Sequence, residues 1–397
     1  MTPTHGDGTL PSAPSFEFAS AGRIVFGRGR IAELPGLCQG LGTRALVVTG
    51  SSAARASAVT AALESSGVEH RVVHVAKEPT VLDATSGVEV GRAFGASFVV
   101  AVGGGSALDL GKAIAALLAN QGEPLDYLEV IGKAQPLERP ALPCIAVPTT
   151  AGTGSEVTKN AVLASPEHGV KVSLRHDSML PRVALVDPEL TLTLPAAVTA
   201  ATGLDALTQC IEPYLSCQAN PLTDVVSLEG VRRGARSLSR AVRDGADAAA
   251  RENMALCSLF GGLSLANAKL GAVHGFAGPI GGMFDSPHGA VCARLLPFVL
   301  EANLLALETR APRHPSRERF QHLARVLTDE PAASARDGIS WVRALCEELA
   351  VPALSSYGMT SAHVENVARK AARSSSMKGN PLVLEERELT DILQKAL

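Results

Sequence analysis

Residues 97–118, SFVVAVGGGSALDLGKAIAALL, decide the fold of this 397-residue chain. Positions 97–102 are apolar almost throughout, as in a strand that is buried on both faces of a sheet. The glycines 103–105 end that strand, and residues 106–118 have the apolar spacing of a helix. A buried strand that passes through a glycine turn into a helix is a unit of parallel sheets.

The same alternation of strands and helices continues on both sides of this stretch. Strands are expected at Arg44–Thr49, which stops at Gly50, at His70–Val75 and at Cys144–Val147, and helices at 53–66 and 82–94. Strands that alternate with helices of this length predict parallel βαβ units in a doubly wound sheet. Ligands of such sheets bind at the carboxyl ends of the strands.

The sequence pattern changes near residues 187–195. Asp187-Pro188 and Pro195 interrupt the chain there, and Ala, Leu and Arg at helical spacing then replace the strand signals. The predicted parts are a flexible tail over 1–14, an α/β domain with a parallel, doubly wound sheet over 15–190, and an all-α domain over 191–397.

The composition excludes several classes of protein. Hydrophobic residues make up 46% and charged residues 19%, which is a globular rather than a disordered composition. A net charge of −3 and an aromatic content of 4% give no reason to expect nucleic acid or an anionic membrane as partner. The sequence shows no signal pattern, no charge-free apolar run of membrane-spanning length, and no CxxC pair among its seven cysteines. We therefore expect a cytoplasmic protein with reduced thiols.

Two glycine-rich loops follow neighbouring strands at the expected ligand-binding edge. The first, Gly103–Ser106, can hold a phosphate with backbone N–H groups ahead of a helix, although a plain tight turn explains it equally well. Its spacing also differs from the GxGxxG fingerprint. The second, PTTAGTGSE at 148–156, follows the next strand, and two such loops on one edge favour a nucleotide site.

A second group of residues has the chemistry of a metal site. The stretch 271–289, GAVHGFAGPIGGMFDSPHG, contains His274 and His288, and Asp205 lies in a predicted helix upstream. Two imidazoles and one carboxylate suit Zn²⁺ or Fe²⁺ and leave a coordination position open for substrate. Spacing alone does not decide between a metal site and histidines that are structural or merely solvated.

Six motifs, in order along the chain, resemble those of the iron-containing (group III) alcohol dehydrogenase family. They are GGGSALDLGKA, PTTAGTGSEVT, LVDPELT, GLDALTQCIEPYLS, GAVHGFAGPIGG and DSPHG, and the likeness runs from about Phe16 to Leu393. The resemblance implies an N-terminal nucleotide-binding α/β domain, a C-terminal helical domain, and a metal in the cleft between them. It also implies a small-molecule alcohol or aldehyde substrate, NAD(P)(H) as coenzyme, and a homodimer or higher homo-oligomer.

Carried over to this sequence, the resemblance makes Asp205, His274 and His288 the metal ligands and the centre of catalysis. Gln209 stands where the family has a further ligand histidine, so it either binds the metal weakly or only orients the site. Gly278 stands where many members have a histidine near the substrate, and its presence enlarges the pocket.

The resemblance also assigns the coenzyme site. Members that prefer NAD tend to have Asp at the position of Gly50, where it repels a 2′-phosphate, so NADP(H) is acceptable here. The expected cofactor-binding residues are Gly50, Ser51, Gly103, Gly104, Gly105, Ser106, Asp109, Thr149, Thr150, Thr153, Ser155 and Lys171. We expect an oxidoreductase that interconverts an alcohol and an aldehyde or ketone with NAD(P) and Fe²⁺ or Zn²⁺. Two alternatives stay open: a metal-independent reductase similar to maleylacetate reductases, and a cofactor-binding homologue without turnover.

Overall fold

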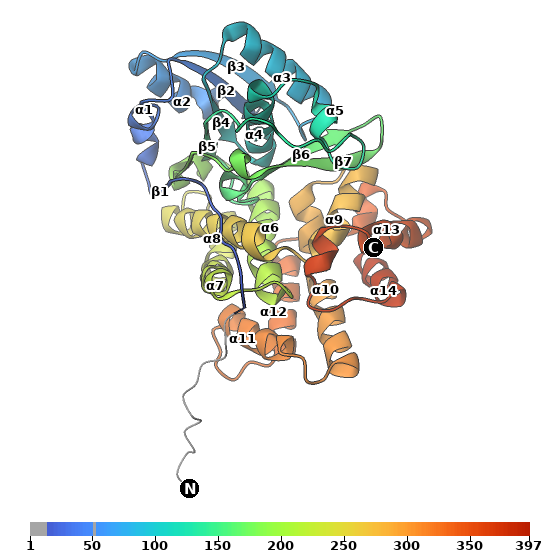
Figure 1. The fold of residues 1–397 in the computed structure, drawn as a ribbon. Coiled ribbons are helices and arrows are strands. Elements are labelled where there is room, and N and C mark those ends of the chain that lie inside the picture. Colours follow the sequence, from blue (N-terminus) through green and yellow to red (C-terminus); the bar gives the residue numbers. More distant parts are fainter. Residues whose placement is uncertain (1–13, 51–52) are drawn as a thin grey trace.

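The computed structural model describes residues 14–50 and 53–397. The predicted tail, apart from residue 14, therefore lies outside the described residues, and so does Ser51. A sheet covered by helices forms one end of the molecule, and a bundle of helices forms the other (Figure 1). The α/β class predicted for the first part and the helical class predicted for the second are both confirmed.

Within the described residues, six parallel strands form the main sheet, in the order β1-β8-β5-β4-β2-β3. Their bounds are β1 Ile24–Phe26, β2 Arg44–Gly50, β3 Glu69–Val75, β4 Phe98–Gly103, β5 Cys144–Pro148 and β8 Val183–Val186. The expected strands β2 to β5 are all present, with ends within one residue of the predicted ends. Sequence analysis did not anticipate β1 and β8, because such short strands carry little periodicity.

An antiparallel hairpin and several helices complete the first part. The hairpin consists of β6 (Asn160–Ser165) and β7 (Val170–Arg175), and it too was not anticipated. The helices that accompany the sheet are α1 Leu34–Leu37, α2 Ala53–Ser65, α3 Val81–Phe94, α4 Gly105–Ala119 and α5 Pro124–Tyr127. Helix α4 lies directly against β4, because a Cβ at Gly111 would meet the Cβ of Ala101 at 2.5 Å. Every residue of β4 is buried, as in a central strand covered on both faces.

The buried Lys112 ties α4 to the hairpin. Its ammonium donates to the carbonyl oxygens of Ser155 at 3.0 Å and Asn160 at 2.5 Å. It also donates to Thr158 Oγ1 at 3.0 Å, and Asp109 lies 3.1 Å away with the opposite charge. A buried ammonium is stable only when its donors are satisfied, so these contacts fix the second glycine-rich loop against the sheet.

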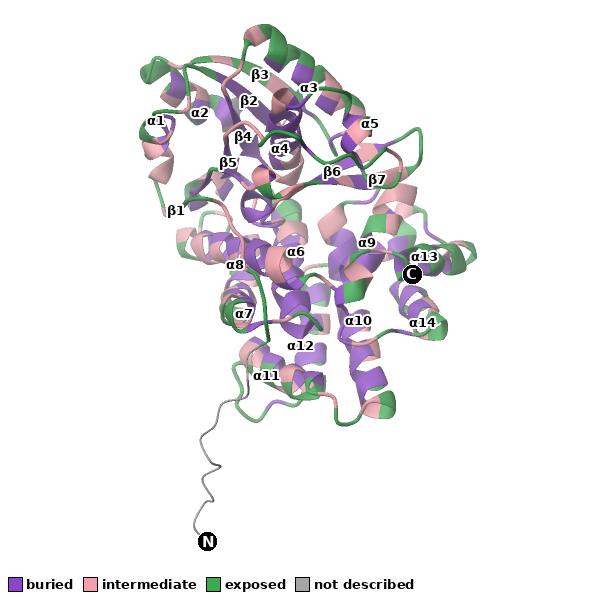
Figure 2. Ribbon diagram, in the orientation of Figure 1, coloured by how far each residue is buried: buried purple, intermediate pink, exposed green. Residues whose placement is uncertain are grey.

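Between residues 196 and 396, all of them described, the chain forms nine α-helices. They are α6 Ala196–Leu215, α7 Pro221–Arg243, α8 Ala248–Ala268, α9 Ala272–Met283, α10 His288–Arg310, α11 Ser316–Thr328, α12 Ala335–Glu348, α13 Val364–Ala372 and α14 Glu386–Ala396. The largest apolar cluster includes α6, α9 and α10 (Figure 2). By length and composition α10 could cross a bilayer, and α8 with α9 passes the same test as a bent pair. Yet 72% of the apolar window of α10 is buried inside the protein, so α10 is a core helix of the bundle.

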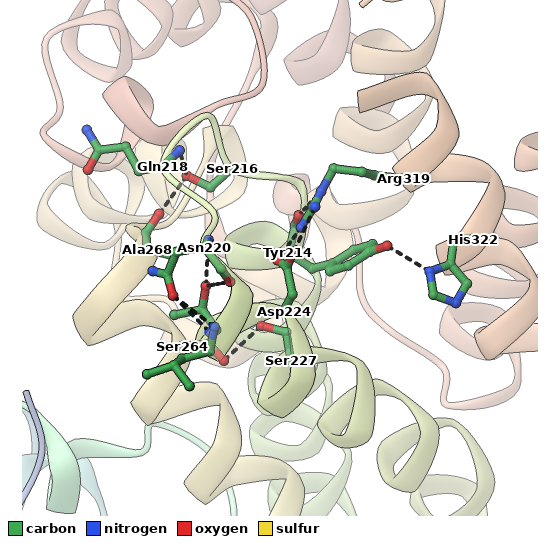
Figure 3. Close-up of polar contacts among 12 residues, drawn as sticks. Tyr214, Ser216, Gln218, Asn220, Asp224, Ser227, Ser264, Ala268, Arg319 and His322 are labelled. Atoms are coloured by element: carbon green, nitrogen blue, oxygen red, sulfur yellow. Dashed lines mark hydrogen bonds and ion pairs between the residues drawn. The ribbon is translucent and has the colours of Figure 1, made fainter. Parts of the chain in front are cut away.

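Polar contacts hold the end of α6, the helix that carries Asp205. Tyr214 Oη lies 3.0 Å from His322 Nδ1 on α11, and the Arg319 guanidinium packs 4.1 Å from the centre of the Tyr214 ring (Figure 3). Arg319 also pairs with Asp224 on α7, where its Nη1 donates to Oδ2 at 2.9 Å. The C-terminal end of α6 is therefore held between α7 and α11.

Glu156 gives the fold a testable dependence on pH. Burial raises the pKa of its carboxyl to about 7, and its own backbone N–H and the charge of Lys112 offset this only in part. The folded chain then holds a proton that the unfolded chain, with an ordinary pKa of 4.5, releases more easily. The contribution of this pKa difference to the free energy of unfolding is complete below about pH 4.5 and is lost as the pH rises through about 7.

Glu156→Gln is neutral at every pH and removes this dependence. We expect the free energy of unfolding of the wild type to fall, relative to that of the variant, by on the order of 3 kcal/mol between about pH 4.5 and pH 8. Urea denaturation across that range measures the difference, with the exposed Glu365→Gln on α13 as the control. A difference that stays constant with pH would show that Glu156 keeps an ordinary pKa.

Candidate active site

Asp205, His274 and His288 come together from three helices of the bundle. Asp205 lies in α6, His274 lies in α9, and His288 is the first residue of α10. The Nε2 atom of His274 is 3.4 Å from Asp205 Oδ1, and that of His288 is 3.8 Å from the same oxygen. The structure thus brings together the three residues that the family resemblance names as ligands.

Close packing of α10 on α6 brings His288 to this point. A Cβ at Gly289 would collide with the carbonyl oxygen of Ala201, so glycine is needed for the start of α10 to approach α6 this closely. Pro287 stands directly before the helix. Since Asp205 lies one helical turn beyond Ala201, the first turn of α10 faces the Asp205 side chain.

Glu212, which sequence analysis did not single out, orients His274. Its Oε2 accepts a hydrogen bond from His274 Nδ1 at 2.6 Å, and its Oε1 accepts one from the backbone N–H of Val273 at 2.7 Å. A carboxylate only accepts, so Nδ1 carries a proton and Nε2 faces Asp205. Glu212 lies two helical turns after Asp205 in GLDALTQCIEPYLS, and that spacing is the signal that could have identified it.

The charges of this cluster shift the pKa values of its members. Burial raises the pKa of Asp205, but both histidines and a hydrogen bond from Gln209 outweigh burial and hold the pKa below its ordinary value. Burial lowers the pKa of His274, but Cys292 and Asp205 outweigh it and raise the pKa well above its ordinary value. The charge of Cys292 raises the pKa of His288 to about 9, against the effect of burial. A metal ion that binds here must therefore displace protons from the imidazoles.

The donor atoms of this cluster fit a divalent cation. Within the part of the chain that the structure describes, Asp205 Oδ1 and Gln209 Oε1 are buried oxygens without a hydrogen-bond partner. Among the described residues, one group of possible ligands has its donor atoms within 4.8 Å of one another: Asp205, His274, His288 and Cys292. A buried oxygen without a partner costs stability, and a cation beside it compensates that cost. Cys292 is not among the residues expected from the sequence.

The two glycine-rich loops meet at the carboxyl edge of the sheet. The N–H of Thr149, directly after β5, donates at 2.8 Å to the carbonyl of Gly103, the last residue of β4. A Cβ at Gly105 would lie 2.7 Å from the Thr153 side chain, so the loops are in contact where α4 begins. Of the residues expected at the cofactor, this edge holds Gly50, Gly103, Gly104, Gly105, Ser106, Thr149, Thr150 and Thr153.

The other expected cofactor residues, Asp109, Ser155 and Lys171, have partners within the protein. Ser155 Oγ donates to Asp109 Oδ1 at 2.5 Å, and Asp109 Oδ2 accepts a backbone N–H from β6 at 2.9 Å. This pair braces the second loop against α4 and the hairpin. Lys171 Nζ lies 3.3 Å from Glu78 Oε2, and a Cβ at Gly281 of α9 would lie 3.1 Å from that nitrogen. Lys171 therefore stands where the sheet part faces the helical part.

The second glycine-rich loop packs against α6 close to Asp205. A Cβ at Gly152 would lie 2.8 Å from the Thr202 side chain on α6, and one at Gly154 would collide with Gly262 on α8. Thr202 precedes Asp205 by nearly one helical turn. The second glycine-rich loop and the carboxylate ligand therefore contact the same stretch of one helix.

Comparison with known proteins identifies the family. A model of the iron-containing alcohol dehydrogenases matches residues 21–188, and a model of the C-terminal part of the Fe-containing alcohol dehydrogenase family matches residues 199–397. The chain belongs to the iron-containing alcohol dehydrogenase family. The resemblance noted in its motifs is confirmed, and the chain is an oxidoreductase of this family.

Members of the family with known names or structures match nearly the whole chain. The 1,3-propanediol dehydrogenase of Klebsiella pneumoniae is 35% identical over 394 residues, which cover 96% of this chain and 98% of that protein. The crystal structure of a 1,3-propanediol oxidoreductase superposes with a TM-score of 0.90 at 33% identity, covering 97% of this chain and 100% of that one. The sulfoacetaldehyde reductase of Bifidobacterium kashiwanohense, in complex with NAD+, gives a TM-score of 0.85 at 27% identity, with 96% and 99% covered.

Glu212→Gln tests the orienting contact at His274. The amide keeps the shape of the side chain but loses the charge that holds His274 Nδ1–H, so we expect Zn²⁺ affinity to fall by roughly 10–100-fold. Competition with a chromophoric chelator measures the affinity, and Glu229→Gln, in a surface pair with Arg232 on α7, is the matched control. Unchanged affinity in a variant with a native circular dichroism spectrum would contradict the orienting role.

Proposed function

We propose that this chain catalyses the reversible, NAD(P)-linked conversion of a small alcohol to its aldehyde or ketone, at a divalent metal held by Asp205, His274 and His288. One observation carries the proposal: three donors from α6, α9 and α10 converge beside the sheet edge where the glycine-rich loops meet. The family uses NAD(P) and a divalent metal, and the donors present suit such a metal.

The surroundings of each metal-binding residue support a distinct role. A divalent metal, when bound, polarises the substrate oxygen and favours loss of its proton during oxidation. Glu212 keeps His274 Nε2 directed towards the metal position through its bond to Nδ1. The His288 side chain is 36% exposed, whereas those of Asp205 and His274 are 3% and 6% exposed, so substrate approaches past His288.

The N-terminus of α4 is suited to the coenzyme pyrophosphate. Gly104 is its N-cap, and the helix runs for 15 residues from Gly105. Free backbone N–H groups and the helix dipole attract a phosphate there, and glycine lets the phosphate approach the backbone. At Gly50, on the neighbouring β2, no described atom lies within 4 Å of a Cβ built on the backbone. Gly50 thus offers no carboxylate to repel a 2′-phosphate, and NADP(H) is accepted.

Gly278 and the relatives support the proposal of a substrate class. No described atom lies within 4 Å of a Cβ built at Gly278, one turn after His274 in α9, so there is room for a substrate chain. The named relatives act on short molecules with a second polar group, 1,3-propanediol and sulfoacetaldehyde. Short alcohols and aldehydes of the same kind are therefore the substrates in this proposal. We further propose that the protein is cytoplasmic and forms a homodimer or higher homo-oligomer. The boundary between its two domains lies near residue 190.

His274→Ala and His288→Ala test the metal site. Each removes one nitrogen donor from the cluster, so we expect loss of bound metal and of turnover while the fold survives. Elemental analysis of the purified proteins measures the metal, and a panel of short alcohols and aldehydes with NAD(P)(H) measures turnover. His168→Ala, in the exposed turn between β6 and β7, is the control and should retain both metal and turnover.

Full metal content in both histidine variants would rule out the ligand assignment. Chelation of the wild type then separates the alternatives that the sequence leaves open. Turnover that survives complete metal removal favours the metal-independent reductase. Tight coenzyme binding without turnover of any substrate favours a cofactor-binding homologue.

Gly50→Asp tests the coenzyme preference. An added carboxylate repels the 2′-phosphate of NADP(H), so we expect the ratio of kcat/KM for NADP(H) to that for NAD(H) to fall roughly tenfold. That corresponds to about 1–2 kcal/mol of charge repulsion in a partly exposed site. Gly50→Asn, with the same shape and no charge, is the matched control. A ratio that does not change would mean that the ribose of the coenzyme lies elsewhere.

A further inference from the structure

We infer that Cys292 is a fourth metal ligand beside one carboxylate and two imidazoles, so that a substrate oxygen binds the metal as a fifth ligand. The inference rests on the proposed function, because it concerns the same site. Cys292 lies in α10, one helical turn after His288, and it is fully buried. Residues one turn apart share a side of a helix, so both side chains point to the same place.

The distances around Cys292 are those of a tetrahedral metal site. A metal about 2.3 Å from sulfur and about 2.1 Å from nitrogen and oxygen places sulfur and nitrogen about 3.6 Å apart, and nitrogen and oxygen about 3.4 Å apart. Cys292 Sγ lies 3.6 Å from His288 Nε2 and 3.7 Å from His274 Nε2. Asp205 Oδ1 lies 3.4 Å and 3.8 Å from the Nε2 atoms of His274 and His288. These four distances lie close to those of a tetrahedral site, and all the donor atoms lie within 4.8 Å of one another.

The contacts of Cys292 differ from those of other buried cysteines. Cys210 and Cys346 donate to backbone carbonyl oxygens at 3.4 Å, which satisfies a thiol as a weak donor. Cys292 instead contacts two imidazole nitrogens, the same two that face Asp205. The role of a small apolar core residue accounts for Cys210 and Cys346, but it does not explain why the sulfur of Cys292 faces the two histidines.

Gln209 is the other candidate for the fourth position. Gln209 lies one helical turn after Asp205 on α6, which suits a residue that orients the carboxylate. Its Oε1 has no hydrogen-bond partner among the described residues, so that oxygen is also free to face a cation. A Cβ at Gly261 would lie 3.0 Å from Gln209 Cβ, so α8 packs closely against this side chain and limits its movement.

Charge favours Cys292 over Gln209. A thiolate and the Asp205 carboxylate bring two negative charges into direct contact with a divalent cation, whereas an amide and Asp205 bring one and leave the second to Glu212, behind His274. A buried ion is stable only when its charge is paired, and three of the four members of this cluster are buried. Thiolate and imidazole donors are also those of zinc sites, whereas harder cations favour sets rich in oxygen.

Cobalt(II) reports directly on a sulfur ligand. We expect the metal-free wild type, loaded with Co²⁺, to show a thiolate-to-metal charge-transfer absorption in the near ultraviolet. Cys292→Ser should lose this absorption but still bind Co²⁺ through the other donors. Cys346→Ser, a buried control on α12, should keep it. In Zn²⁺ titrations Cys292→Ser should lose more than the roughly 10–100-fold in affinity that an orienting residue contributes, and Gln209→Ala should lose less.

The outcomes separate this inference from the proposed function. A wild type that binds Co²⁺ without the charge-transfer absorption overturns the inference and leaves the proposed function standing. A wild type that binds no more Co²⁺ than His274→Ala overturns both. A greater loss of Zn²⁺ affinity in Gln209→Ala than in Cys292→Ser assigns the fourth position to Gln209 and also overturns the inference.

A measurement on the unaltered chain covers the case in which Cys292→Ser fails to fold. Zinc X-ray absorption spectroscopy of the wild type loaded with one Zn²⁺ resolves sulfur from lighter neighbours by distance. We expect one sulfur at about 2.3 Å beside nitrogen and oxygen at about 2.0–2.2 Å. A shell of nitrogen and oxygen alone overturns the inference.

Discussion

A pair of buried carboxylates on one helix is the constraint on which the helical part depends. Asp205 and Glu212 lie two turns apart on α6, and both are buried. Buried carboxylates are costly unless charge and hydrogen bonds compensate them. His274 donates a hydrogen bond from Nδ1 to Glu212 at 2.6 Å, and its Nε2 lies 3.4 Å from Asp205. The imidazole joins the two carboxylates, and the position of α9 against α6 follows from that contact.

The same helix sets the distance between the two binding regions. Gly152 lies against the Thr202 side chain on α6, and Gly154 lies against Gly262 on α8, so the second loop packs directly on the bundle. Lys112 holds the other end of that loop to α4. Transfer between two bound groups requires reacting atoms about 3–3.5 Å apart, so the relation between loop edge and metal ligands must be kept within narrow limits. The close contacts of Gly152 and Gly154 with the bundle, and the buried ammonium of Lys112, hold the loop in place relative to α6.

Local patterns predict the sheet because a buried strand, a glycine turn and a helix are encoded in consecutive residues. The candidate metal ligands are more difficult to predict from the sequence, because the spacing of the histidines does not show whether they bind a metal. Only the resemblance to the family motifs identifies them. Glu212 and Cys292 escape sequence analysis because packing creates their roles: one is a single charge in a helix, the other a small residue in an apolar run. Asp109 was expected at the cofactor, but its carboxylate accepts hydrogen bonds from Ser155 and from the hairpin. Residue type alone does not reveal these partners.

Helical periodicity would let the proposed site bind a metal although Gln209 stands where the family motif has a histidine. Helix α6 presents Asp205 and Gln209 one turn apart, and α10 presents His288 and Cys292 with the same spacing. Each pair directs two side chains to one side of its helix, so both helices offer the metal a second donor. A fourth ligand can then come from α10 instead of α6 without any change in either backbone. Because the helices set the place of the metal and single side chains set the donor type, metal preference can differ within one fold.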